Sequence, residues 1–305
     1  MKWIRDRRAR RVHDERADVG NDERPVLLHA LDGFLGAGSG PRLAAEHIGG
    51  DDAEVLESFD VDEFYDYRAR RPPMVFDEDH YADYEAPTLD VRLHHDDHGT
   101  PYLVLAGPEP DYRWEAFAEA VADVIERYNV GLTVGMGAVP MGVPHTRPLV
   151  VTQHGTSKSL LDQRNLWNGQ VIVPASAQAM LEYRLGEWGL DAIGYVVHVP
   201  HYLAQVDYPA ASIALLEAVA RRTGLAFDLE YLRTKQVEAI ADIEEQIREQ
   251  DGGEVLASLE QQYDAFSRGA NQSLLAGDEP LPSGDELGRQ FEQFLAQVDK
   301  RDDES

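Results

Sequence analysis

Polar residues that could act as acids, bases or anion ligands follow several of the apolar runs in this sequence. Four of them stand where a predicted strand ends: Asp32, Glu109, Asp111 and His145. Carboxylates beside a histidine can transfer protons, and Arg113 and Arg147 could bind an anionic group. Acidic residues at the ends of loops are also common helix caps. Two interpretations therefore stay open for these residues, a chemical site and a set of structural caps.

Two further segments contain residues that could bind an anion or act as a nucleophile, but they match no known motif. The turn over residues 33–40 contains four glycines before Pro41, and glycines between a strand and a helix can cradle an anion. Its spacing is not G-x-G-x-x-G and no G-K-[ST] follows, so we predict a tight turn. Ser157 and Lys158 could pair a nucleophile with a base, but their neighbours fit no Ser/Lys enzyme pattern.

Histidines occur in two clusters. Residues 94–98 read His-His-Asp-Asp-His, but adjacent strand residues point to opposite faces, so we expect a solvated hairpin tip and no metal site. His198 and His201 follow the last predicted strand, where open α/β sheets bind ligands. Because nothing nearby completes a ligand set, we expect them to be hydrogen-bonded structural histidines.

Apolar runs and helical periodicities alternate along the first three quarters of the chain. The predicted strands cover residues 26–31, 54–59, 89–93, 101–106, 129–136, 149–152 and 192–199, and the predicted helices cover 41–48, 114–128, 175–188 and 210–222. This order predicts an α/β fold with a mostly parallel sheet covered on both faces. Residues 60–87, rich in aromatic and acidic residues, are expected to form an extended excursion over the surface. Stretches of this kind are usually functional or form interfaces.

The remaining sequence is helical in pattern. Apolar residues at three-to-four spacing over 229–247 and 256–266 predict an antiparallel hairpin, and residues 287–298 repeat the stripe in a third helix. We therefore expect an N-terminal tail at 1–24, an α/β core at 25–225, a helical region at 226–299 and a disordered acidic end at 300–305.

Composition narrows the function classes. The 305 residues include 28 Lys+Arg and 56 Asp+Glu, a formal net charge of −28, which argues against binding to nucleic acid or to an anionic membrane. Cysteine is absent, which excludes disulfides and thiolate metal sites. With no secretory signal and no apolar run of membrane-spanning length, we expect a cytoplasmic protein without a metal or cofactor.

Three segments resemble one protein family. They are residues 28–33 (LHALDG), residues 107–114 (GPEPDYRW) and, most specific, residues 137–140 (GAVP) followed by 143–148 (VPHTRP). Together they resemble the prokaryotic proteasome-assembly-chaperone-like family in its longer actinobacterial form, in order over approximately residues 25–270. The candidate ligand- or partner-binding residues are those of these motifs: Asp32, Glu109, Asp111, Arg113, Trp114, His145, Thr146 and Arg147.

The resemblance implies a three-layer α/β/α sandwich, similar to nucleoside phosphorylases and related hydrolases, with a C-terminal helical extension. It also implies self-association into a homo-oligomer such as a trimer, and a chaperone-like or scaffold role with proteasome subunits or other proteins as partners. Relatives that dock on proteasome rings tend to end in a hydrophobic–Tyr–any-residue tail, whereas this sequence ends Asp303-Glu304-Ser305, so docking by that route is not expected.

Two hypotheses follow. The first is a non-enzymatic protein-binding scaffold. The second is a small-molecule enzyme or sensor with a pocket at the carboxyl ends of the strands, built from Asp32, Glu109 and His145 with Arg113 and Arg147 for an anion.

Overall fold

The computed structural model describes residues 24–49, 53–162, 170–249 and 252–273. The predicted third helix, the acidic end and residues 1–23 of the predicted tail lie outside these ranges. Within the described residues, no helix combines the length and the apolarity needed to cross a bilayer.

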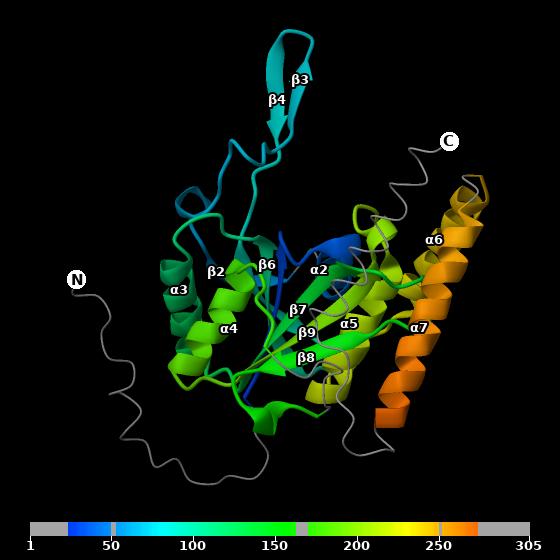
Figure 1. The fold of residues 1–305 in the computed structure, drawn as a ribbon. Helices are drawn as coiled ribbons and strands as arrows, with labels where there is room; N and C mark the ends of the chain where they lie inside the picture. Colours follow the sequence, from blue (N-terminus) through cyan, green and yellow to red (C-terminus); the bar gives the residue numbers. More distant parts are fainter. Residues whose placement is uncertain (1–23, 50–52, 163–169, 250–251, 274–305) are drawn as a thin grey trace.

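A seven-stranded mixed sheet forms the centre of the molecule (Figure 1). Its strands, in the order in which they lie side by side, are β2 (Glu54–Ser58), β5 (Asp90–His95), β6 (Pro101–Pro108), β1 (Val26–Asp32), β7 (Leu132–Met141), β9 (Ala192–Pro200) and β8 (Val151–Gly155). The four central strands are parallel, and the outer strands β2, β5 and β8 pair antiparallel. The carboxyl ends of β6, β1, β7 and β9 therefore meet at one edge of the sheet.

Helices cover both faces of the sheet. They are α2 (Gly40–Ile48) and α5 (Pro209–Thr223) on one face, and α3 (Trp114–Arg127) and α4 (Ala177–Glu187) on the other. The alternation of side chains along β1 divides the core, because Leu28 and Ala30 pack with α2 and α5 whereas Leu27 and Leu31 pack with α3. This arrangement confirms the predicted α/β architecture.

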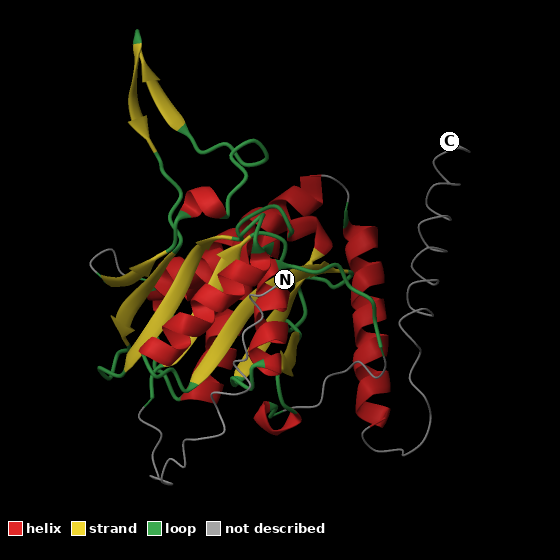
Figure 2. Ribbon diagram, turned by 90° about the vertical axis from the view of Figure 1, so that its left-hand side faces the viewer, coloured by secondary structure: helices red, strands yellow, loops and turns green. Residues whose placement is uncertain are grey.

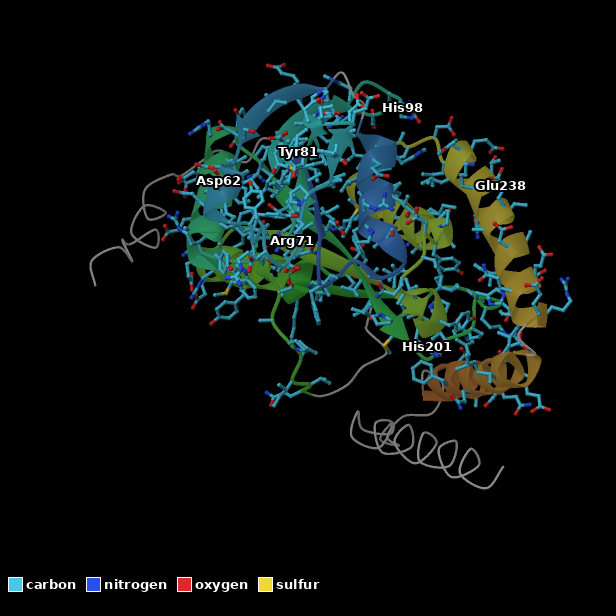
Figure 3. All side chains as sticks on the ribbon, turned by 90° about the horizontal axis from the view of Figure 1, so that it is seen from above. Asp62, Arg71, Tyr81, His98, His201 and Glu238 are labelled. Carbon is cyan, nitrogen blue, oxygen red and sulfur yellow. The ribbon has the colours of Figure 1, made fainter. Side chains whose placement is uncertain are left out.

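Two helices extend the α2/α5 side. They are α6 (Glu230–Glu249), which packs on α5, and α7 (Gly253–Ser273). Figure 3 shows α7 at a steep angle to α6, so the two helices do not pack as the antiparallel hairpin that the sequence predicted. Leu232 and Ile243 of α6 are buried with the core of that face, and Gly224 ends α5 with a φ of 76°.

The excursion over residues 60–87 contains regular structure that its irregular sequence did not predict. Strands β3 (Met74–Asp77) and β4 (His80–Tyr84) form a separate two-stranded sheet. In Figures 1 and 2 this hairpin, here called the arm, stands away from the body beyond the carboxyl edge of the sheet. Four short 3₁₀ turns complete the described elements: η2 (Ala37–Ser39), η3 (Val61–Glu63), η4 (Lys158–Leu160) and η5 (His201–Leu203).

Two further local predictions were wrong. Strand β7 begins at Leu132 rather than Asn129, because Asn129 takes a left-handed φ of 51°, and it continues to Met141 because its pairing with β9 extends that far. The His94–His98 cluster is not fully solvated. His94 packs on Tyr102, and Asp96 is buried because it accepts hydrogen bonds from the backbone of the hairpin and of Ala226.

Candidate functional site

The eight candidate residues all lie near the carboxyl edge of the sheet but form two separate groups. Five of them lie at the end of β1 or just after β6: Asp32, Glu109, Asp111, Arg113 and Trp114. The other three, His145, Thr146 and Arg147, lie in the loop between β7 and β8. Figure 3 looks down on this edge, with Arg71 and Tyr81 of the excursion on one side and His201 of η5 toward α7 on the other.

Glu109 joins three elements. Its Oε2 accepts a hydrogen bond from the backbone N of Phe34 at 2.6 Å, and its Oε1 accepts one from the N of Ala177, the first residue of α4, at 2.7 Å. A carboxylate at a helix N-terminus also interacts favourably with the helix dipole. A Cβ at Gly33 would lie 2.1 Å from Oε2, so the motif requires glycine there. Both carboxylate oxygens of Glu109 are therefore used within the chain.

Asp111 anchors the excursion through a residue that the sequence analysis missed. The guanidinium of Arg70 donates to the Asp111 carboxylate at 2.5 Å and to the carbonyl oxygens of Asp32 at 3.2 Å and Glu109 at 2.5 Å. It also lies over the ring of Tyr65, 4.5 Å from the centroid. Arg70 belongs to none of the three motifs, and nothing in the sequence marks its role.

The rest of this group also makes contacts inside the chain. Arg113 pairs with Glu63 at 2.5 Å, and the indole N–H of Trp114 donates to the carbonyl oxygen of Pro110 at 2.7 Å. Gly107 has a φ of 140°, and a Cβ there would lie 2.2 Å from the carbonyl oxygen of Thr88. The GPEPDYRW motif therefore holds the excursion against the sheet edge.

The PHTRP motif (residues 144–148) attaches α7 to the loop between β7 and β8. Arg147 donates to both carboxylate oxygens of Asp264, at 2.8 and 3.0 Å, and to Glu260 at 3.3 Å. Thr146 donates to the same Glu260, and the hydroxyl of Tyr263 donates to the carbonyl oxygen of Pro148 at 2.8 Å. The hydrogen bond and charge of Asp264 raise the pKa of Arg147, which keeps the guanidinium charged.

His145 lies beneath this contact. Its backbone N donates to the hydroxyl oxygen of Tyr202 at 2.9 Å, and the same hydroxyl is hydrogen-bonded to Nδ1 at 2.7 Å. Nε2 is buried and has no hydrogen-bond partner in the described part of the chain. Burial lowers the pKa of His145, while Glu244 and Glu260 oppose that shift. The side chain is therefore a neutral imidazole at pH 7.

A third polar group, also missed, lies under α4. His29 of β1 is 2% exposed, and burial and the nearby His154 lower its pKa to about 4. A Cβ at Gly135 on the neighbouring strand would lie 2.7 Å from the imidazole Cε1, so glycine makes room for the ring. Gln178 of α4 approaches the same glycine, and His29 Nδ1 and Gln178 Oε1 have no hydrogen-bond partner among the described residues. A histidine inside an apolar strand was the signal available in the sequence.

The remaining candidates take structural roles. His198 hydrogen-bonds Thr152 at 2.9 Å, and burial lowers its pKa to about 4. Ser157 accepts a hydrogen bond from the backbone of Ser159 at the start of η4. Across the described ranges, no group of three or more His, Cys, Asp or Glu side chains is arranged to hold a metal ion.

The comparisons with known proteins give the family. The model of the PAC2 family matches residues 30–250. The chain belongs to the PAC2 family. A Mycobacterium tuberculosis protein of unknown function is 46% identical, with a TM-score of 0.77 over 80% of this chain and 86% of that chain. A Corynebacterium glutamicum protein of unknown function is 36% identical, with a TM-score of 0.76 over 82% and 94%.

A third similar structure is described by a function. A Mycobacterium tuberculosis proteasome-assembly chaperone homologue is 25% identical, with a TM-score of 0.68 over 73% of this chain and 95% of that chain. The comparison with curated proteins gives no match. The family predicted from the three motifs is confirmed. In this PAC2 chain the motifs hold the excursion and α7, and a role for the eight residues toward a ligand or partner stays a prediction.

Proposed function

We propose that this protein is a non-enzymatic, self-associating, chaperone-like scaffold of the cytoplasm, with proteasome subunits among its protein partners. Membership in the PAC2 family and the similarity to a proteasome-assembly chaperone homologue support a chaperone-like role. The charged side chains of the two motifs are engaged in contacts within the chain, which favours this role over the small-molecule hypothesis built on the same residues.

The main support for this proposal is the exposed apolar surface of the arm. Its large apolar side chains are exposed: Met74 52%, Val75 54%, Phe76 59%, Tyr81 70% and Tyr84 44%. Within the arm, the rings of Phe76 and Tyr81 pack edge to face with centroids 5.2 Å apart. An isolated two-stranded hairpin is marginally stable in water, and exposed apolar patches mark interaction sites. A protein surface that covers the arm would stabilise it.

A second exposed apolar segment leads into α4. Val171, Ile172 and Val173 are 62%, 101% and 70% exposed in a stretch without regular secondary structure. Copies of a chain with a net charge of −28 repel one another, so apolar contacts must supply the attraction between them. Because salt screens the repulsion, association should strengthen rather than weaken as salt is added.

Sedimentation velocity on the full-length protein tests self-association. We expect the wild type to sediment as an oligomer and the Phe76→Ser/Tyr81→Ser variant to sediment as a smaller species. The control, His80→Ser/Asp83→Ser, changes exposed polar residues on the same hairpin and should keep the wild-type size. An oligomer of unchanged size in the Phe76/Tyr81 variant would exclude the arm as the interface.

Affinity co-purification from the native host tests the partner. Stoichiometric recovery of proteasome subunits with the tagged wild type, lost in the arm variant, would support the assembly role. The His145→Ala/Arg147→Ala variant tests whether the motif loop takes part. Recovery of the tagged chain without other proteins at several salt concentrations would contradict a partner-binding function.

A further inference from the structure

A cleft of about 660 Å³ lies beside α2, separate from the motif contacts with α7. Its walls come from α2, from the β5–β6 part of the sheet and from residues at the base of the arm, such as Pro72, Pro73 and Pro87. It reaches the carboxyl ends of β1 and β6 at Asp32 and Pro108. Small-molecule sites occupy this range of volumes, and this edge is where α/β sheets bind ligands. Among the side chains that the structure describes, none from α6 or α7 lines it.

The floor of the cleft combines small apolar side chains with the polar residues Asp90, Arg92 and His94 of β5. Ala30, Ala45, Val104 and Ala106 supply small side chains along the sheet and helix. His94 is 7% exposed, and its ring stacks on Tyr102 with centroids 5.7 Å apart. Within the described part of the chain, neither nitrogen of its imidazole has a hydrogen-bond partner. A buried polar group usually has one, so His94 offers the cleft an unused donor and acceptor.

Burial fixes the protonation state of this histidine. Burial, followed by the positive charges of Arg92 and His95, lowers the pKa of His94. The ring is therefore neutral at pH 7 and presents one nitrogen lone pair, which accepts a hydrogen bond from an N–H donor.

The cleft is lined by more carboxylates than cationic side chains. The lining includes two guanidiniums, Arg42 and Arg92, and four carboxylates: Asp32, Glu46, Glu85 and Asp90. Arg42 is paired with Glu46 and Asp207, both at 2.6 Å, and Arg92 is paired with Asp90 at 3.2 Å. Both cations are thus engaged within the chain, and an anionic ligand would meet the excess negative charge.

Two carboxylates remain for a ligand. The side chains of Asp32 and Glu85 form neither an ion pair nor a hydrogen bond within the described residues. Asp32 lies at the end of β1 and Glu85 at the base of the arm, so they approach the cleft from different elements. A molecule with two separated positive groups could contact both while its methylenes cover the small apolar floor.

We propose that this cleft binds a small organic cation that carries ammonium or guanidinium groups on an aliphatic chain. Asp32 and Glu85 pair with the charged groups, His94 accepts a hydrogen bond from an N–H of the ligand, and the alanine-lined floor contacts its methylenes. This binding does not depend on the protein-binding function of the arm.

Isothermal titration calorimetry on the full-length protein tests the site, with agmatine and spermidine as probes at about 0.15 M salt, where the Debye length is about 8 Å. Glutarate serves as the anionic probe and should give no binding heat. We expect saturable binding of at least one cation at a stoichiometry of one. The Asp32→Asn/Glu85→Gln variant should bind it about tenfold or more weakly, which corresponds to about 1.4 kcal/mol. His94→Phe keeps a ring against Tyr102 but removes the acceptor, and should weaken binding severalfold.

A matched control distinguishes binding in the cleft from the general attraction of cations to this acidic protein. Glu245→Gln/Glu254→Gln makes the same change in net charge on exposed positions of α6 and α7 and should leave the affinity unchanged. Equal weakening in this control would show diffuse attraction by the acidic surface and overturn the proposal. So would the absence of saturable binding of either cation to the wild type.

Discussion

Acidification should destabilise this protein through its buried histidines, and His29 gives the sharpest case. Its pKa in the folded state is about 4, against an ordinary value of 6.5, because burial disfavours the charged ring. Above pH 6.5 both the folded and the unfolded chain hold it neutral. Between that pH and about 4, the imidazole is protonated in the unfolded chain but stays neutral in the folded chain. The free energy of unfolding therefore falls as the pH drops toward 4.

The magnitude follows from the two pKa values. Between pH 7 and pH 5, one histidine shifted in this way lowers the free energy of unfolding by about 2 kcal/mol. His198 has the same shift and should contribute a similar amount. The two together predict a loss of about 4 kcal/mol, a large part of the stability of an ordinary domain.

Urea denaturation of the wild type and of His29→Gln, measured from pH 7 to pH 5, checks this reasoning. The variant should lose about 2 kcal/mol less than the wild type over that range, whatever its stability at pH 7. Leu27→Ala, on the same face of β1, should cost about 3 kcal/mol at every pH and run parallel to the wild type. A His29→Gln curve parallel to the wild type would refute the assignment of the pH dependence to this buried ring.

Three further substitutions test the motif contacts. Glu109→Gln removes a charged acceptor shared by two backbone N–H groups and should lower the free energy of unfolding by about 2 kcal/mol in urea denaturation. Arg147→Gln should increase hydrogen exchange in α7 while exchange in the sheet stays unchanged, because the guanidinium holds α7 to the loop after β7. Gly107→Ala should destabilise the protein and increase proteolysis of the excursion, because the new Cβ would meet the carbonyl oxygen of Thr88.

The control for each of these three variants makes the same type of substitution at a position outside the motif contacts. Glu115→Gln changes an exposed ion pair with Arg184 and should cost at most about 1 kcal/mol, as surface pairs usually do. Arg184→Gln should leave exchange in α7 unchanged. Gly99→Ala substitutes a glycine that also has a positive φ, 81°, but whose Cβ would meet no neighbour, so it carries the backbone strain without the clash and should destabilise the protein less than Gly107→Ala. Equal effects in the test and control variants would contradict the roles assigned to the motifs.

The sequence predicted most of the sheet and the layers because those elements depend on local periodicity. The apolar run at 26–31 and the amphipathic helix at 114–128 both appear where expected, within one residue at each end. The end of β7 was not predictable in this way. Its last residues are a strand because β9 pairs with them, a contact between positions far apart in the sequence.

The candidate site was predicted as a set of residues but not as an arrangement. All eight lie near one edge of the sheet, as the strand ends implied. Their partners, such as Arg70 for Asp111 and Asp264 for Arg147, come from segments whose position depends on tertiary packing. Spacing along the chain carries no information about such partners, so Arg70 was missed. The buried His29 was missed although its position inside an apolar strand was a signal in the sequence.

The pairing of Arg147 with Asp264 links two positions 117 residues apart. Selection on either position then acts on both, because the ion pair stabilises the protein only when the arginine and the aspartate are both present. Among relatives aligned over this region, the two positions should covary. A relative that ends before the equivalent of α7 should no longer be constrained to keep arginine in the loop after β7. The PHTRP segment would then serve as a marker in genome sequences for the helical extension, and its last three residues would drift together once that extension is lost.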